Sequence, residues 1–242
     1  YFFTCVEKHS DSADFSRKGD AEALYWSLCE KSSRLPYDSM LAAMNSLDNH
    51  DHSRFVTRTG GHVARMTCEN AAELAADVDL GLYRMAVCFQ FTWPGAPCIY
   101  YGDETGLPGF TDPDNRRTFP WGKENWELIE FYRQMAALHK RFACLRTGSV
   151  HLLRFDSGIA AFARTLGDET VLTVINMGDI ADCELDLACL GIEDGAAVRE
   201  FGTDAAGYTI GHIDVPVCGG KLQLQMKEKS AIVLSVQEAQ AK

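Results

Sequence analysis

Three features that would mark a specialised class of protein are missing from this sequence. No hydrophobic run approaches the roughly 18 residues that a membrane-spanning helix requires, so the chain is not expected to enter a membrane. The nine cysteines are scattered without a Cys-x-x-Cys pair, which disfavours a disulfide framework or a zinc site and favours reduced thiols in a cytoplasmic protein. The formal net charge of -11 disfavours nucleic acid as a partner, because binding to phosphates depends on Lys and Arg.

The composition is that of an ordinary globular protein. Of the 242 residues, 46% are hydrophobic, enough for one or two cores. In the first 146 residues, apolar positions recur at helical spacing in three stretches, and two short apolar runs lie between them. This pattern predicts helices over residues 20–31, from about 70 to 90 and from about 125 to 142, buried parallel strands over 40–47 and 98–101, and loops over 57–67 and 107–121.

After residue 147 the hydrophobic period changes to alternation, which is typical of strands with one buried face. Turn signals such as Gly167-Asp168 and Gly219-Gly220 separate the alternating segments. Short strands at this spacing indicate an antiparallel β-sandwich, so we predict two domains, residues 1–146 and 147–242. The predicted strands are 150–155, 159–165, 170–176, 183–187, 196–201, 208–214, 221–226 and 230–236.

Two polar segments follow the predicted strands of the first part. Residues 49–51 are Asn-His-Asp and come directly after the strand at 40–47. Residues 94–104 are Pro-Gly-Ala-Pro-Cys-Ile-Tyr-Tyr-Gly-Asp-Glu, and residues 111–117 are Thr-Asp-Pro-Asp-Asn-Arg-Arg. Carboxylates and an imidazole just past the ends of buried parallel strands occupy the place where (β/α)8 enzymes hold their catalytic groups.

Together these segments resemble the α-amylase family of glycoside hydrolases, in its α-glucosidase, neopullulanase and cyclomaltodextrinase branch. In that family the seventh strand of a (β/α)8 barrel ends in Asn-His-Asp or Ser-His-Asp, and the eighth carries Gly-x-Pro-x-Ile-Tyr-Tyr-Gly-Asp-Glu. Both motifs occur here in that order and cover most of residues 40–146. The resemblance implies that the chain is the C-terminal part of a (β/α)8 barrel followed by an antiparallel β-sandwich domain.

The resemblance also implies that part of the reaction centre lies elsewhere. The family's reaction needs a nucleophilic aspartate after the fourth strand and an acid/base glutamate after the fifth, and neither motif occurs here. A complete barrel takes roughly 250 residues, whereas only residues 1–146 precede the β-rich part, and the chain begins at Tyr1 without an initiator Met. We therefore predict an enzyme fragment that is inactive alone and whose partner is the missing N-terminal part of the barrel.

Asp51 and His50 are the first candidate site residues. By the resemblance, Asp51 is the family's third carboxylate, which stabilises the transition state by binding hydroxyls of the sugar at the cleavage point, and His50 donates a hydrogen bond to that sugar. The alternatives are a turn cap for Asp51 and a structural role for His50. A metal site with His52 is disfavoured, because adjacent residues of an extended segment point to opposite sides and no second ligand cluster follows. We expect neither a metal nor a cofactor.

Asp112 and Arg116 lie in the segment that the resemblance places one sugar site beyond the cleaved bond. Arg116 presents donors and Asp112 presents acceptors to neighbouring hydroxyls. The alternative is a salt bridge that folds the loop, and both can hold. Tyr101 is a further candidate for substrate binding, although it could instead pack in the barrel wall. Glu104 is also a carboxylate at a strand end, but the family pattern makes it structural.

The sequence thus predicts part of a retaining hydrolase that cleaves α-glucosidic bonds, α-1,4 linkages in malto-oligosaccharides and related α-glucans. Two other classes stay open. In one, the sandwich is a carbohydrate-binding module, which requires exposed aromatic side chains within residues 147–242. In the other, a partner chain or a second copy completes the half-barrel, because an open edge of a parallel sheet is otherwise an aggregation hazard.

Overall fold

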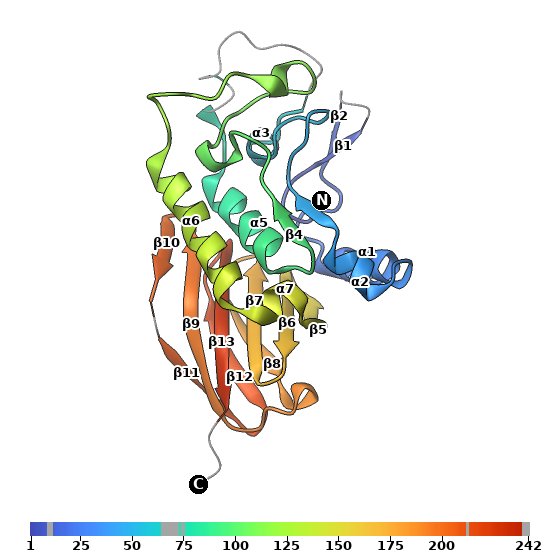
Figure 1. The fold of residues 1–242 in the computed structure, drawn as a ribbon, viewed down its shortest axis with the longest axis vertical. Coiled ribbons are helices and arrows are strands. Elements are labelled where there is room, and N and C mark those ends of the chain that lie inside the picture. Colours follow the sequence, from blue (N-terminus) through green and yellow to red (C-terminus); the bar gives the residue numbers. More distant parts are fainter. Residues whose placement is uncertain (9–11, 64–72, 74–75, 212, 239–242) are drawn as a thin grey trace.

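A helical part of the chain packs on an antiparallel sheet (Figure 1). The computed structural model describes residues 1–8, 12–63, 73, 76–211 and 213–238. The predicted order, helices with short strands followed by an antiparallel β part, is confirmed. The helical part contains β1 (Val6–Lys8), β2 (Ser12–Asp14), α1 (Ala21–Ser33), α2 (Tyr37–Leu41), β3 (Met44–Ser46), α3 (Phe55–Thr59), α5 (Leu80–Thr92), β4 (Ala96–Cys98), η1 (Asp103–Thr105), η2 (Asp114–Arg116), α6 (Trp126–Arg141) and α7 (Ala143–Thr147).

The three long helices begin at side chains that cap them. Asp20 accepts a hydrogen bond from the third residue of α1 at 2.8 Å, and Asp79 and Asn125 do the same for α5 and α6 at 2.9 and 3.1 Å. Such caps satisfy backbone N–H groups that have no partner within the helix. The predictions for residues 20–31 and 125–142 are confirmed. The predicted helix from residue 70 is observed as α5 from Leu80, and residues 64–72, 74 and 75 lie outside the described part.

The predicted strand over 40–47 is wrong in its first half. Met40 and Leu41 belong to α2, and β3 begins only at Met44. Pro36 precedes α2, and its ring fixes a backbone angle compatible with the start of a helix. The loop predicted from residue 57 is also partly wrong, because residues 57–59 complete the buried helix α3.

The described part contains one parallel strand pair, β3 with β4, and the second strand is observed at 96–98 rather than at 98–101. Side-chain amides connect the pair to α5. Asn45 Nδ2 donates to Trp93 O and Pro94 O at 3.1 Å each, and Gln90 Nε2 donates to Asn45 O and Cys98 O at 2.8 Å each. The position of β4 therefore depends on the end of α5.

The antiparallel part is one continuous sheet that folds over on itself. Its hydrogen-bonded order is β5-β6-β7-β13-β9-β11-β12-β8, with β10 paired to β9, and the two ends contact each other through β5 and β8. The segment predicted as one strand at 208–214 is instead two strands that both pair antiparallel with β9, β10 with residues 201–204 and β11 with residues 195–198. The bounds are β5 (Ser149–Asp156), β6 (Ile159–Leu166), β7 (Glu169–Asn176), β8 (Ala181–Asp186), β9 (Gly195–Asp204), β10 (Gly207–Ile210), β11 (Asp214–Cys218), β12 (Lys221–Met226) and β13 (Ser230–Glu238), with η3 (Ala188–Leu190) after β8.

Two hydrophobic cores result. One fills the folded sheet, between β6, β7 and β13 on one side and β8, β11 and β12 on the other. The second joins α5 and α6 to the outer face of the sheet, where the Phe131 ring lies 5.4 Å from the rings of both Phe201 and Tyr208. The helical part and the sheet therefore share a core, and each stabilises the other.

Candidate active site

The carboxyl ends of β3 and β4 lie at the same edge because the two strands are parallel, with Met44 paired to Ala96 and Ser46 to Cys98. Residues 47–54 follow β3, and residues 99–103 follow β4. A third segment is bonded to the first, because Asn115 Nδ2 donates to His52 O at 2.8 Å and to Asn49 O at 3.3 Å. The two segments that carry the predicted sugar contacts, 49–52 and 111–117, therefore lie against each other.

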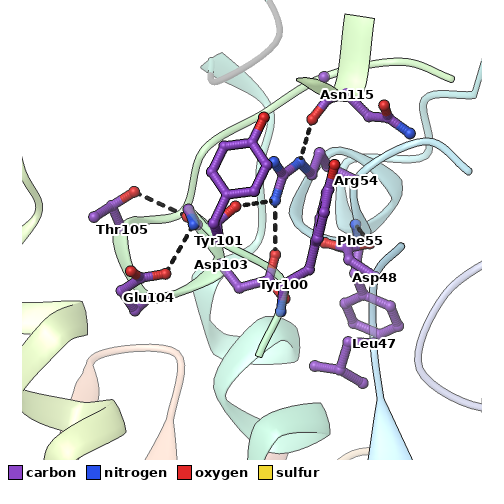
Figure 2. Close-up of polar contacts among 12 residues, drawn as sticks. Leu47, Asp48, Arg54, Phe55, Tyr100, Tyr101, Asp103, Glu104, Thr105 and Asn115 are labelled. Atoms are coloured by element: carbon purple, nitrogen blue, oxygen red, sulfur yellow. Dashed lines mark hydrogen bonds and ion pairs between the residues drawn. The ribbon is translucent and has the colours of Figure 1, made fainter. Parts of the chain in front are cut away.

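Arg54 is completely buried where these segments meet (Figure 2). Its Nη1 donates to Tyr101 O at 2.7 Å and to Asp103 Oδ1 at 3.0 Å, and its Nε donates to Asn115 O at 2.9 Å. The guanidinium carbon lies 4.2 Å from the centre of the Tyr100 ring and 4.9 Å from that of Tyr101, within the range of a cation–π contact. One side chain thus contacts the segment after β4 and the segment around η2.

Two buried carboxyl groups, Asp48 and Asp103, interact beside Arg54. Burial raises the pKa of Asp48, and burial together with the neighbouring Asp48 raises the pKa of Asp103 well above its usual range. Asp48 Oδ1 accepts the Phe55 N–H at 2.5 Å, whereas no described residue donates to the buried Asp48 Oδ2. The side-chain hydrogen bond between Asp48 and Asp103 requires a proton on one of the two carboxyls. Arg58, 3.8 Å from Asp48, offsets the burial only in part.

This pair makes the free energy of unfolding depend on pH. A carboxyl whose pKa is raised on folding binds more protons in the folded state, so its contribution is present below the unfolded pKa and is lost as the pH rises through the folded pKa. We therefore expect Asp48→Asn, which keeps the acceptor for Phe55 and adds a donor for Asp103, to be more stable than the native chain at pH 8 by on the order of 1–2 kcal/mol, with the difference shrinking toward pH 4.

Urea unfolding at pH 4 to 8 measures this difference. The control is Asp156→Asn, because the pKa of Asp156 is lowered by its hydrogen bond to Arg154. That variant should be slightly less stable than the native chain at pH 8, by under about 1 kcal/mol, as expected for an exposed pair. A constant difference between Asp48→Asn and the native chain across this range would show that the buried pair does not titrate as inferred.

Asp51 and His50 project to the surface beside this buried cluster. Their side chains are 67% and 58% exposed, and His50 Nε2 lies 3.4 Å from Asp51 Oδ1. The local turn is closed by Asn49, whose Oδ1 accepts the Asp51 N–H at 2.8 Å. The Asp51 carboxylate is therefore available to a ligand, and the capping role is carried by its neighbour.

Asp112 and Arg116 form the salt bridge given above as an alternative, with Arg116 Nε 2.6 Å from Asp112 Oδ1. Both side chains are about half exposed, so the pair can also contact a ligand. Tyr101 is 41% exposed and donates its hydroxyl to Arg117 O at 2.9 Å. Glu104 Oε2 accepts the Gly102 N–H at 2.9 Å and so folds back on its own turn.

Arg54, Asp48 and Asn115 are residues of this cluster that the sequence patterns did not single out. Arg54 bonds to Tyr101, 47 positions away, and Asn115 bonds to Asn49, 66 positions away. Asp48 accepts the backbone N–H of Phe55, a bond that its sequence does not indicate. The available signal was a charged residue beside the apolar pair Phe55-Val56, since charged side chains are rarely fully buried unless they are paired. Among the described residues, no group of three or more His, Cys, Asp or Glu side chains could hold a metal ion. In the same part of the chain, no helix combines the length and the apolar composition of a membrane span.

Known proteins resemble this chain in sequence and in structure. The family described as alpha amylase, catalytic domain, matches residues 3–140. The chain belongs to the α-amylase family. Neopullulanase 2 of Thermoactinomyces vulgaris is 38% identical over 179 residues, which are 72% of this chain and 26% of that protein. Cyclomaltodextrinase of Geobacillus thermopakistaniensis is 37% identical over 144 residues, 58% of this chain and 22% of that protein.

Solved structures of the α-amylase family show the same fold. The debranching enzyme of Nostoc punctiforme superposes with a TM-score of 0.72 at 28% identity, covering 96% of this chain and 44% of that one. A cyclomaltodextrinase superposes with a TM-score of 0.71 at 25% identity, covering 91% and 34%. The chain thus spans about a quarter or less of the curated relatives named above. It is a segment of an amylase catalytic domain followed by an antiparallel β domain.

Proposed function

We propose that this chain is the C-terminal part of a retaining α-glucan hydrolase that cleaves α-1,4-glucosidic bonds in malto-oligosaccharides. The observation that carries the proposal is the contact between segments 49–52 and 111–117 at the carboxyl ends of two parallel strands. Relatives named neopullulanase and cyclomaltodextrinase support the substrate class, as does the Nostoc punctiforme enzyme, whose crystals were soaked with acarbose. A relative named intracellular maltogenic amylase supports a cytoplasmic location.

In this proposal each exposed residue has one role. Asp51 binds hydroxyls of the sugar at the cleavage point and stabilises the flattened, positively charged transition state. His50 donates to the same sugar, while Asp112, Arg116 and Tyr101 bind the next one. The domain boundary at residues 146 and 147 belongs to the proposal, with the first domain forming one side of the active site.

The described carboxylates near Asp51 do not supply the missing nucleophile and acid. Retention requires two carboxyl groups about 5 Å apart that both reach the glycosidic bond. Asp48 and Asp103 are 4% and 2% exposed, and Glu104 is bound to its own turn. The isolated chain is therefore proposed to be inactive.

We expect the purified chain not to hydrolyse nitrophenyl α-glucoside, and activity to appear when it is coexpressed with the preceding part of the barrel from a relative such as neopullulanase 2. The reason is that the two reacting carboxylates would then be supplied in trans. Release of nitrophenol measures the activity, and the preceding part expressed alone is the control. Hydrolysis by the isolated chain would refute the proposed division of the site.

The binding-module alternative has less support. It requires aromatic side chains exposed on the sheet, yet Phe162 and Phe201 are buried and the Tyr208 ring stacks on that of Phe201 at 5.6 Å. Phe155 packs against Tyr25, with ring centres 5.7 Å apart. The alternative in which another chain completes the half-barrel is compatible with the complementation experiment, and a sizing measurement of the isolated chain distinguishes self-association from completion by a different partner.

A further inference from the structure

Arg54 is among the largest side chains of the described part that are fully buried. A buried arginine is costly unless its donors are used. Here the guanidinium donates to three acceptors, of which only Asp103 Oδ1 belongs to an ionisable side chain, while Tyr101 O and Asn115 O are backbone carbonyls. Compensating the charge of Arg54 would need only the Asp48–Asp103 carboxyl pair. The additional bonds to two separate backbone segments therefore call for a geometric explanation.

The bonds made by Arg54 close a loop around the exposed candidate residues. Its own N–H donates to Gly109 O at 2.9 Å, so both its backbone and its side chain bind the segment 109–117. In the opposite direction, the side-chain amide of Asn115 donates to His52 O and Asn49 O. Asp51 thus lies between two points, residues 49 and 54, that are both fixed to the segment carrying Asp112 and Arg116.

We propose that Arg54 is a positioning residue, whose guanidinium holds the segment with Asp51 in register with the segment with Asp112 and Arg116. The role of this register in catalysis rests on the proposed function, whereas the hydrogen bonds of Arg54 are observed independently of it. The planar fork of Arg reaches acceptors in two directions at once, whereas the ammonium of Lys, with the same charge, offers no such fixed geometry. Arg54→Lys therefore separates positioning from charge compensation.

The test is hydrogen exchange of backbone amides in the purified chain, followed by NMR. Useful reporters are the N–H groups of Asp51 and Arg54 in one segment and of Phe110 and Asp114 in the other, all of which are hydrogen-bonded. We expect Arg54→Lys to lower protection in both segments by about tenfold, which corresponds to the loss of one to two net hydrogen bonds. The two segments should change together.

A matched control is Arg84→Lys. Arg84 is also buried, at 5% exposure, and donates through Nε and Nη2 to Thr203 Oγ1 and Asp204 O at 3.0 Å each, both in β9. This variant should leave exchange at Asp51 and Phe110 unchanged. If Arg54→Lys does not fold, Asn115→Ala removes the side-chain amide that donates to His52 O and Asn49 O, without removing a charge. This variant should lower the protection of the Asp51 and Arg54 amides against exchange.

Retained protection in Arg54→Lys would overturn the proposal, because charge compensation would then be sufficient. The same conclusion would follow if only one segment lost protection, or if Arg84→Lys had an equal effect on both. The measurement uses no substrate, so a negative result leaves the proposed function standing. Conversely, failure of complementation would leave the coupling of the two segments intact.

Discussion

Asp51→Asn is expected to lower kcat of the complemented enzyme on nitrophenyl α-glucoside by about 10²- to 10³-fold, the range found when one preorganised electrostatic group is removed from an active site. The reason is that hydrogen bonds from sugar hydroxyls to a carboxylate strengthen as positive charge develops on the ring, so the loss falls mainly on the transition state. The Asp51 side chain is 67% exposed and pairs with the exposed side chain of His50, so folding should be unaffected.

Glu104→Gln is the matched control for this experiment. Both variants replace a carboxylate by an amide just past a parallel strand, but Glu104 accepts the Gly102 N–H of its own turn, and a glutamine oxygen can still accept it. We expect less than about a twofold change in kcat for Glu104→Gln, since its acceptor survives. An Asp51→Asn variant that raises KM while leaving kcat intact would assign Asp51 to uniform substrate binding instead.

Local features of this fold were predictable because their causes lie within a few residues. Asp20 and Asn125 precede their helices and cap them, and the alternation in residues 150–236 follows from the two-residue period of a strand. The break between β10 and β11 was missed because the apolar residues Ile210 and Ile213 continue the pattern across it. The hydrophobic pattern alone therefore did not distinguish one long strand from two short ones.

Features that depend on long-range partners were not predictable from one sequence. The motif at 49–51 predicted the edge of the candidate site, but no residue near Arg54 in the sequence predicts its bonds to Tyr101 and Asn115. Likewise, burial raises the pKa of Asp48, and burial together with Asp48 raises the pKa of Asp103, and both causes exist only in the folded chain. The resemblance identified the exposed residues, whereas the structure was needed to find what holds them.

The helical part is also held from the sheet by hydrogen bonds of Arg164 in β6. Arg164 is fully buried and donates to Thr92 O and Leu145 O at 3.0 Å each, and to Gly148 O at 2.9 Å. These carbonyls belong to the ends of α5 and α7, where backbone acceptors have no partner in the helix and the helix dipole favours a cation. Because Asn45 fixes β3 to the same end of α5, Arg164 supports the candidate site from a distance.

Arg164→Met is therefore expected to lower the free energy of unfolding by about 3 kcal/mol, since it removes the Arg164 donor from the buried carbonyls of Thr92 and Leu145, at about 1–3 kcal/mol each. Part of that cost is offset, because burial lowers the pKa of Arg164 and its removal relieves the desolvation of a charge. The control, Arg133→Met, removes an exposed helical pair with Glu130 and should cost under about 0.5 kcal/mol. Urea unfolding measures both. Equal, small effects would mean that Arg164 does not hold the helical part, and that the shared hydrophobic core alone joins it to the sheet.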